Sequence, residues 1–298
     1  MKDREKSIYR VTIWGAVVNV ALAAVKFIAG LVGRSNAMMA DAVHSLSDLV
    51  SDVVVLVMVS FSTKGRDKGH DYGHGKFETL ATACVSLLLV LVGCQLMSSG
   101  VGKIREVING GTIEVPGKIA LWAAIVSIIV KEILYQWTAR TGKAVGSPAV
   151  VTNAWHHRTD ALSSIGSGIG IGAAILFGGK WVILAPIVGC AISIFIFYIA
   201  VKMAIPALDE LTDGSLPDDI EEEIIELARS TEGVDNVHAL KTRRIGPNIV
   251  IEAHIVVNPQ MTVAKAHSIT EKVEERLQQR YGAATQISLH VEPDVMSK

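Results

Sequence analysis

The sequence predicts a multi-pass α-helical membrane protein with a C-terminal α+β domain of the ferredoxin-like αββαβ type. Half of the 298 residues are hydrophobic. The long apolar runs all fall before residue 208, where the composition changes to acidic and amphipathic. We therefore expect a six-helix transmembrane domain over residues 1–207 and a cytoplasmic domain over residues 208–298. A chain of this length agrees with about two domains.

Six apolar runs are long enough to cross a bilayer. A helix that rises 1.5 Å per residue needs about 20 apolar residues to span about 30 Å of hydrocarbon. We expect spans at residues 11–32, 37–62, 78–102, 117–139, 148–178 and 181–206. Residues 1–10 are expected to form a charged tail before the first span.

The basic residues between these spans predict the orientation. On the side of the N-terminus they are Lys2, Arg4, Lys6, Arg10, Lys64, Arg66, Lys68, Lys76, Arg140 and Lys143. On the other side they are Arg34, Lys103, Arg105, Lys118 and Lys180. Because cytoplasmic loops carry the excess of Lys and Arg, both termini are predicted to lie in the cytoplasm and the chain in the cell (inner) membrane.

The pattern after residue 208 predicts the small domain. We expect a helix at 217–230, strands at 236–244 and 248–257, a helix at 262–280 and a strand at 285–292. In the second strand, apolar residues alternate with others in the period of a half-buried strand. The order αββαβ is typical of a two-layer sandwich.

The composition also argues against nucleic-acid binding and against a chemical role for the cysteines. The net charge of −1 and the absence of a basic stripe argue against a nucleic-acid partner. Cys84, Cys94 and Cys190 lie in apolar runs without CxxC spacing and are expected to be inert.

Two His–Asp pairs inside apolar segments predict a metal site. His44 and Asp48, and likewise His156 and Asp160, stand four residues apart, so each pair shares one helix face. Together they offer the number and type of ligands that a tetrahedral Zn²⁺ takes. The alternative is a polar seam that only holds helices together. His157 points away from this face, and we expect it to lie at the membrane interface or to contact the ligands from behind.

The protonation of the ligands indicates how such a site would transport a metal cation. Metal ligands must be deprotonated, so binding releases protons, and a site open to each compartment in turn exchanges cation for H⁺. Zn²⁺ is the first candidate, and Fe²⁺, Cd²⁺, Co²⁺ and Mn²⁺ accept the same ligands. The alternatives are a membrane-anchored metal sensor and an intramembrane metalloenzyme. The enzyme would need an open coordination position, which four ligands fill.

Two further groups of histidines lie outside the spans. His70 and His74, with Asp67 or Asp71, are candidates for an exposed site in the loop 62–76, unless the loop is only a solvated turn. The soluble domain holds a second set of candidate ligands: His238, His254, His267, His290 and Glu292. These residues could be chance surface polarity. The better interpretation is a metal site that stabilises the domain or a dimer and senses metal.

Over nearly its whole length the chain resembles the cation diffusion facilitators, proton-coupled exporters of Zn²⁺ and related cations. The resemblance lies in six spans, paired ligands in spans two and five, the Gly-His-Gly-Lys loop and an αββαβ domain. It implies intramembrane ligands His44, Asp48, His156 and Asp160, a loop site of Asp67, His70 and His74, and a cytoplasmic binuclear site of His238, His254, His267, His290 and Glu292. It also implies a homodimer and a Lys76–Asp213 salt bridge. The chain departs from bacterial zinc members, which carry Asp at the position of His44, and from the usual Asp at the position of Glu292.

Overall fold

The computed structural model describes residues 2–32, 42, 45–46, 48–109, 118–177, 181 and 183–294. Of the predicted metal ligands, His44 lies outside these residues. The chain divides into two compact units, Met1–Thr63 with Phe77–Ala207 and Lys64–Lys76 with Leu208–Lys298. The loop after the second predicted span therefore folds with the C-terminal residues.

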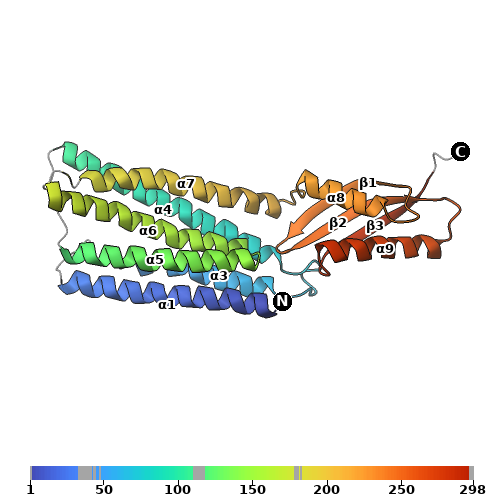
Figure 1. Ribbon diagram of the computed structural model, residues 1–298, viewed down its shortest axis with the longest axis horizontal. Coiled ribbons are helices and arrows are strands. Elements are labelled where there is room, and N and C mark those ends of the chain that lie inside the picture. The colour runs from blue at the N-terminus through green and yellow to red at the C-terminus, as the bar shows by residue number, and fades with distance from the viewer. Residues whose placement is uncertain are drawn as a thin grey trace. The chain divides into compact units, whose positions relative to one another are not determined.

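The first unit is a bundle of long helices. Its described helices are α1 (Lys2–Val32), α3 (Leu49–Ser62), α4 (Lys76–Ile108), α5 (Lys118–Ala144), α6 (Pro148–Phe177) and α7 (Leu184–Leu211), which run alongside one another (Figure 1). Among the described residues, α1, α4 and α7 are long and apolar enough to cross a membrane, and α3 is a shorter apolar helix. Val53, Leu87 and Ile194 are more than half exposed, as side chains that face lipid would be. The predicted helical membrane domain is confirmed.

The charged segment at residues 1–10 is helical from Lys2 onward, where α1 already begins. The Arg4 guanidinium donates two hydrogen bonds of 2.8 Å to the buried carboxylate of Glu78 on α4. Ile8 is fully buried in an apolar cluster with Val55 of α3. This segment is therefore helical because one of its faces packs into the bundle, while its other charges remain at the surface.

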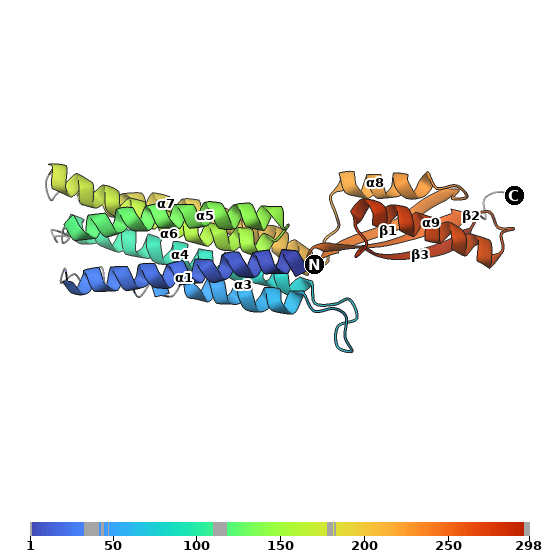
Figure 2. The same ribbon diagram turned by 60° about the horizontal axis from the view of Figure 1, so that its bottom comes forward.

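The second unit is the predicted αββαβ sandwich. Its elements are α8 (Asp218–Arg229), β1 (Asn236–Ile245), β2 (Asn248–Val257), α9 (Val263–Tyr281) and β3 (Gln286–Pro293). The sheet order is β1-β2-β3, with β1 antiparallel and β3 parallel to β2. The two helices pack along this sheet (Figure 2). Ile251 and Ile255 of β2 are fully buried against Val273 and Leu277 of α9, so the alternation along β2 separates a core face from an outer face.

The loop 64–76 packs on this domain. A Cβ on Gly75 would lie 2.6 Å from the carbonyl oxygen of Ile245, so only glycine allows the loop this close to the end of β1. The ammonium of Lys76 lies 2.6 Å from Oδ1 of Asp213, which confirms the predicted salt bridge. The Arg243 guanidinium covers the ring of Tyr72, 4.9 Å from its centre.

Candidate metal sites

The intramembrane cluster joins α3 and α6. Asp48 stands directly before α3, and His156 and Asp160 lie one turn apart on α6. One ligand atom from each lies within 4.8 Å of the others. The His156 Nε2–Asp48 Oδ1 distance is 3.7 Å. This is close to the separation of about 3.3 Å between ligands of one tetrahedral ion with bonds of about 2.0–2.1 Å, and too long for a hydrogen bond.

This cluster is buried inside the bundle. Asp48 and His156 are buried, and among the described residues neither ring nitrogen of His156 has a hydrogen-bond partner. A buried polar group without a partner costs about 1–3 kcal/mol, and a cation shared by these ligands would remove that cost.

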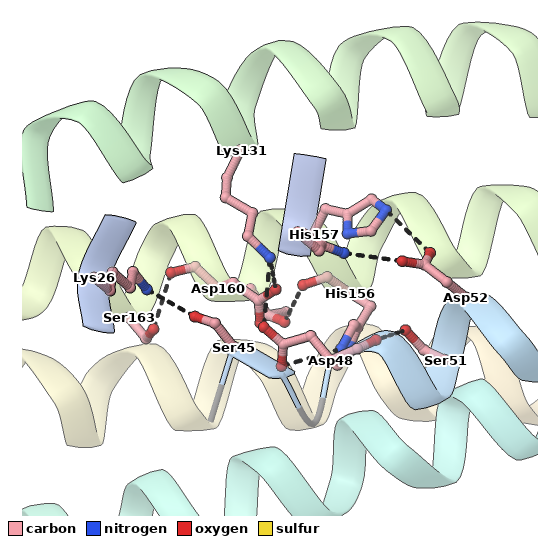
Figure 3. A network of polar contacts seen from close by, with 12 residues as sticks. Lys26, Ser45, Asp48, Ser51, Asp52, Lys131, His156, His157, Asp160 and Ser163 are labelled. Atoms are coloured by element: carbon pink, nitrogen blue, oxygen red, sulfur yellow. Dashed lines mark hydrogen bonds and ion pairs between the residues drawn. The ribbon is translucent and has the colours of Figure 1, made fainter. Parts of the chain in front are cut away.

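A lysine that our sequence analysis did not consider lies at the centre of the cluster. Lys131 reaches from α5 to Asp160 and Asp48 (Figure 3). Its Nζ lies 2.7 Å from Asp160 Oδ2 and 3.4 Å from Asp48 Oδ2, and its side chain is 1% exposed. A charged residue within a predicted span was the signal available in the sequence, since such residues are costly and usually functional.

A further group of buried polar residues lies one turn beyond Asp48. Asp52 of α3 accepts hydrogen bonds from the side-chain amides of Asn19 and Asn153, at 2.9 and 2.7 Å. His157 Nε2 lies 3.6 Å from Asp52 Oδ1. His157 thus faces Asp52, whereas His156 faces Asp48 (Figure 3). Asn19 and Asn153 were missed, because a single amide in a predicted span is a weak signal.

The loop brings three of its candidates together. Asp67 Oδ1 lies 3.5 Å from His70 Nδ1, and Asp67 Oδ2 lies 3.5 Å from His74 Nε2. The backbone N–H groups of Gly69 and His70 donate to Asp67 and hold the pKa of its carboxyl below the usual value. His74 Nδ1 lies 3.1 Å from the carbonyl oxygen of Gly65. With the proton on Nδ1, Nε2 of His74 carries the lone pair that a metal ligand needs, 3.5 Å from Asp67 Oδ2. Asp71 is not part of this group.

In the cytoplasmic domain, three histidines form a row across the sheet. His238, His254 and His290 are register partners on β1, β2 and β3. Glu292 accepts from His254 at 2.8 Å and from His238 at 3.0 Å. Partial burial raises the pKa of Glu292, but hydrogen bonds from the two histidines outweigh it and the pKa lies below 4.5. The longer Glu side chain therefore reaches the row.

Two predicted cytoplasmic ligands are less central. His290 packs its ring on His254, with centroids 4.9 Å apart, and its Nε2 lies 3.8 Å from Glu292. His267 lies on α9, is 71% exposed and faces Glu271 at 3.5 Å. Since α9 packs on the core face of the sheet and the histidine row lies on the outer face, His267 does not join the row within one protomer.

The chain is similar to known proteins along most of its length. Residues 12–212 match the family "Cation efflux transmembrane domain", and residues 216–294 match "Cation efflux protein, cytoplasmic domain". The chain is 34% identical over 290 residues to metal tolerance protein C1 of Arabidopsis thaliana, covering 94% of this chain and 61% of that protein. It is 28% identical over 295 residues to manganese efflux system protein MneP of Bacillus subtilis, covering 98% of each. It is 32% identical over 287 residues to the uncharacterized transporter YdbO of B. subtilis, covering 94% and 95%.

Apolar helices around a buried cluster of carboxylates and imidazoles, with matches to cation efflux domains, define a membrane transporter of divalent metal cations. The chain belongs to the cation diffusion facilitator family. The predicted family is confirmed, and its members are transporters rather than enzymes.

Proposed function

We propose that this protein exports Zn²⁺ from the cytoplasm in exchange for protons, at an intramembrane site made of His44, Asp48, His156 and Asp160. The observation that carries the proposal is the convergence of Asp48, His156 and Asp160, from two helices, within the bundle. His44 lies outside the described residues, and its spacing from Asp48 supports it as the fourth ligand.

Mn²⁺ is the second candidate substrate. The observation that favours it is the similarity to MneP, whose name assigns manganese efflux to that protein and which matches along its whole length. Imidazole and carboxylate ligands accept either ion, and geometry decides between them.

Proton exchange follows from the ligands. The cation binds when His156 is neutral and the carboxylates are ionised, and protons that return to these groups release it. The Lys131 ammonium pairs with the same two carboxylates that the cation needs. The arriving cation therefore displaces Lys131, and Lys131 returns when the cation leaves.

We further propose that both termini and the loop 64–76 are cytoplasmic, in the cell (inner) membrane, and that residues 1–207 and 208–298 are the membrane and cytoplasmic domains. The loop cluster of Asp67, His70 and His74 and the cytoplasmic row would hold additional ions. Because His267 lies on the other face from the row, a second copy of the chain would have to supply it. This supports a homodimer.

Flux into proteoliposomes under an imposed pH gradient tests the proposal. The chain should accumulate Zn²⁺ or Mn²⁺ only when the gradient is present, and Asp160→Asn should abolish the flux. Glu132→Gln is the matched control, since this carboxylate of α5 is 40% exposed and pairs with Arg158 rather than with the cluster. A chain that binds metal but shows no flux would support the membrane-anchored sensor instead.

A further inference from the structure

A second polar cluster lies inside the bundle, next to the proposed transport site. It consists of Asn19 of α1, Asp52 of α3, and Asn153 and His157 of α6, each completely buried. Asp52 follows Asp48 by four residues, so it lies about 6 Å further along α3. Asn153 and His157 precede Asp160 on α6. The cluster therefore lies toward the end of the bundle where α1 begins and α3 ends.

The ligand atoms of this cluster are spaced for a cation. Asp52 Oδ1 and His157 Nε2 are 3.6 Å apart, which is too long for a hydrogen bond and close to the separation of two ligands of one ion. A Cβ added to Gly15 would lie 3.5 Å from His157 Nε2 and 3.8 Å from Asp52 Oδ1. Glycine at this position thus leaves the space beside both ligand atoms without a side chain.

Several buried polar atoms of this cluster have no hydrogen-bond partner among the described residues. They are Asn19 Oδ1, Asn153 Oδ1 and both ring nitrogens of His157. Among the same residues, Asp52 forms an ion pair with His157 and with no other side chain. A seam that serves only to pack helices is expected to pair its buried polar atoms. Here, two amide oxygens and one imidazole lack partners, and the carboxylate beside them accepts a single amide hydrogen bond at each oxygen, which leaves each oxygen a further lone pair for a positive ion.

We infer that Asn19, Asp52, Asn153 and His157 form a second cation site, which a divalent first-row ion occupies on its way between that end of the bundle and the site at Asp48. Rotation of the two amides would add their oxygens to the carboxylate and the imidazole. A set with three oxygen ligands suits Mn²⁺ or Fe²⁺ better than a sulfur-rich set would. Only the direction of movement rests on the proposed function; the binding site itself does not.

Two dications one helical turn apart repel one another strongly. The two sites are therefore occupied in turn rather than together, and disabling one should leave the other able to bind. This distinguishes a second site from residues that merely support the first.

The experiment counts Mn²⁺ bound to the full chain in nanodiscs by electron paramagnetic resonance, since free Mn²⁺ gives a sharp spectrum. The loop and cytoplasmic clusters are first removed by Asp67→Ala, His74→Ala, His238→Ala and His254→Ala. In this background, His156→Ala with Asp160→Asn disables the site at Asp48. One Mn²⁺ per protomer should still bind, and adding Asp52→Asn should abolish it.

The inference is overturned if the chain with a disabled Asp48 site binds no Mn²⁺, or if the ion persists after Asp52→Asn. If Asp52→Asn fails to fold, Gly15→Ala gives the same test, since its methyl group would lie in contact with both ligand atoms, where it hinders an ion, and should weaken binding about tenfold or more. Gly102→Ala is its matched control, because a Cβ there meets nothing within 4 Å. Flux of the unmodified chain is measured separately, so loss of the second site and failure of the transport proposal are distinguishable.

Discussion

Lys131 should act as an internal competitor of the transported cation, and the change Lys131→Met tests this. Its ammonium lies 2.7 Å from Asp160 Oδ2 and 3.4 Å from Asp48 Oδ2, inside the bundle. A metal ion that takes these oxygens must first displace the ammonium. Removing Lys131 should therefore tighten metal binding while it destabilises the metal-free protein.

The size of both effects can be estimated. Two unit charges about 4 Å apart interact by about 4 kcal/mol at an effective dielectric constant of about 20. Since about 1.4 kcal/mol is a factor of ten, competition by Lys131 weakens metal binding by up to about 10³-fold. Removing one partner of a buried ion pair costs about 3–5 kcal/mol, which Lys131→Met would impose on the metal-free protein.

The assay is thermal unfolding in nanodiscs with and without Zn²⁺ or Mn²⁺, together with equilibrium binding. Metal-free Lys131→Met should unfold at a lower temperature than the unmodified chain, and metal should raise its unfolding temperature by more, because tighter binding stabilises the folded state further. Lys131→Arg retains the charge and should keep the weaker affinity. Lys26→Met removes a second buried lysine, which donates to Ser45 at 2.9 Å, and should not tighten binding. Equal or weaker metal binding by Lys131→Met would refute the competition.

Three further changes test other parts of the molecule. Arg4→Met leaves the carboxylate of Glu78 buried without its partner and should lower the stability of the bundle by about 3–5 kcal/mol; an unchanged unfolding temperature would show that water reaches Glu78. Lys76→Ala should make trypsin cleave the loop 64–76 faster at neutral pH. The Lys76 hydrogen bond lowers the pKa of Asp213 below 3.8, so the contribution of the pair is present above pH 3.8 and is lost as the pH falls through the lower folded value. The effect of Lys76→Ala on thermal unfolding should therefore fade in acid, and an effect that persists there would exclude the ion pair as its cause. Glu292→Gln should weaken metal binding by the cytoplasmic row about 10- to 100-fold, as measured by calorimetry on a chain that carries Asp67→Ala, Asp52→Asn and Asp160→Asn, and unchanged affinity would exclude Glu292 as a ligand.

The sequence allowed the elements of the cytoplasmic domain to be predicted to within a few residues, because β2 alternates and α8 and α9 each have one apolar face. Spacing along one helix predicted that His156 and Asp160 share a face, and the four ligands that a tetrahedral ion takes led us to expect Asp48 beside them. The sequence could not predict Lys131 among them, because that depends on which face of α5 packs against α6. Spacing within one helix contains no information about its neighbours.

The loop is a second case in which tertiary packing overrides sequence order. Lys64–Lys76 follows a predicted span directly, and its composition is that of a solvated turn. Yet it folds with the C-terminal residues, because Gly75 allows close contact with Ile245 and because Lys76 pairs with Asp213. The salt bridge was expected from the family resemblance alone, since no local pattern links residues 137 positions apart.

The arrangement of charges gives a physical reason for placing an ammonium inside a cation site. A pathway must bind its ion well enough for the ion to enter and weakly enough for it to leave. Asp48 and Asp160 without a counter-ion would hold a dication too tightly inside the bundle and would repel one another once it left. Lys131 addresses both difficulties, because it neutralises one carboxylate in the metal-free state and competes with the ion in the loaded state. In the proposed exchange, release then requires fewer protons to neutralise the two carboxylates than it would without the lysine, and the strength of binding depends on how easily Lys131 returns.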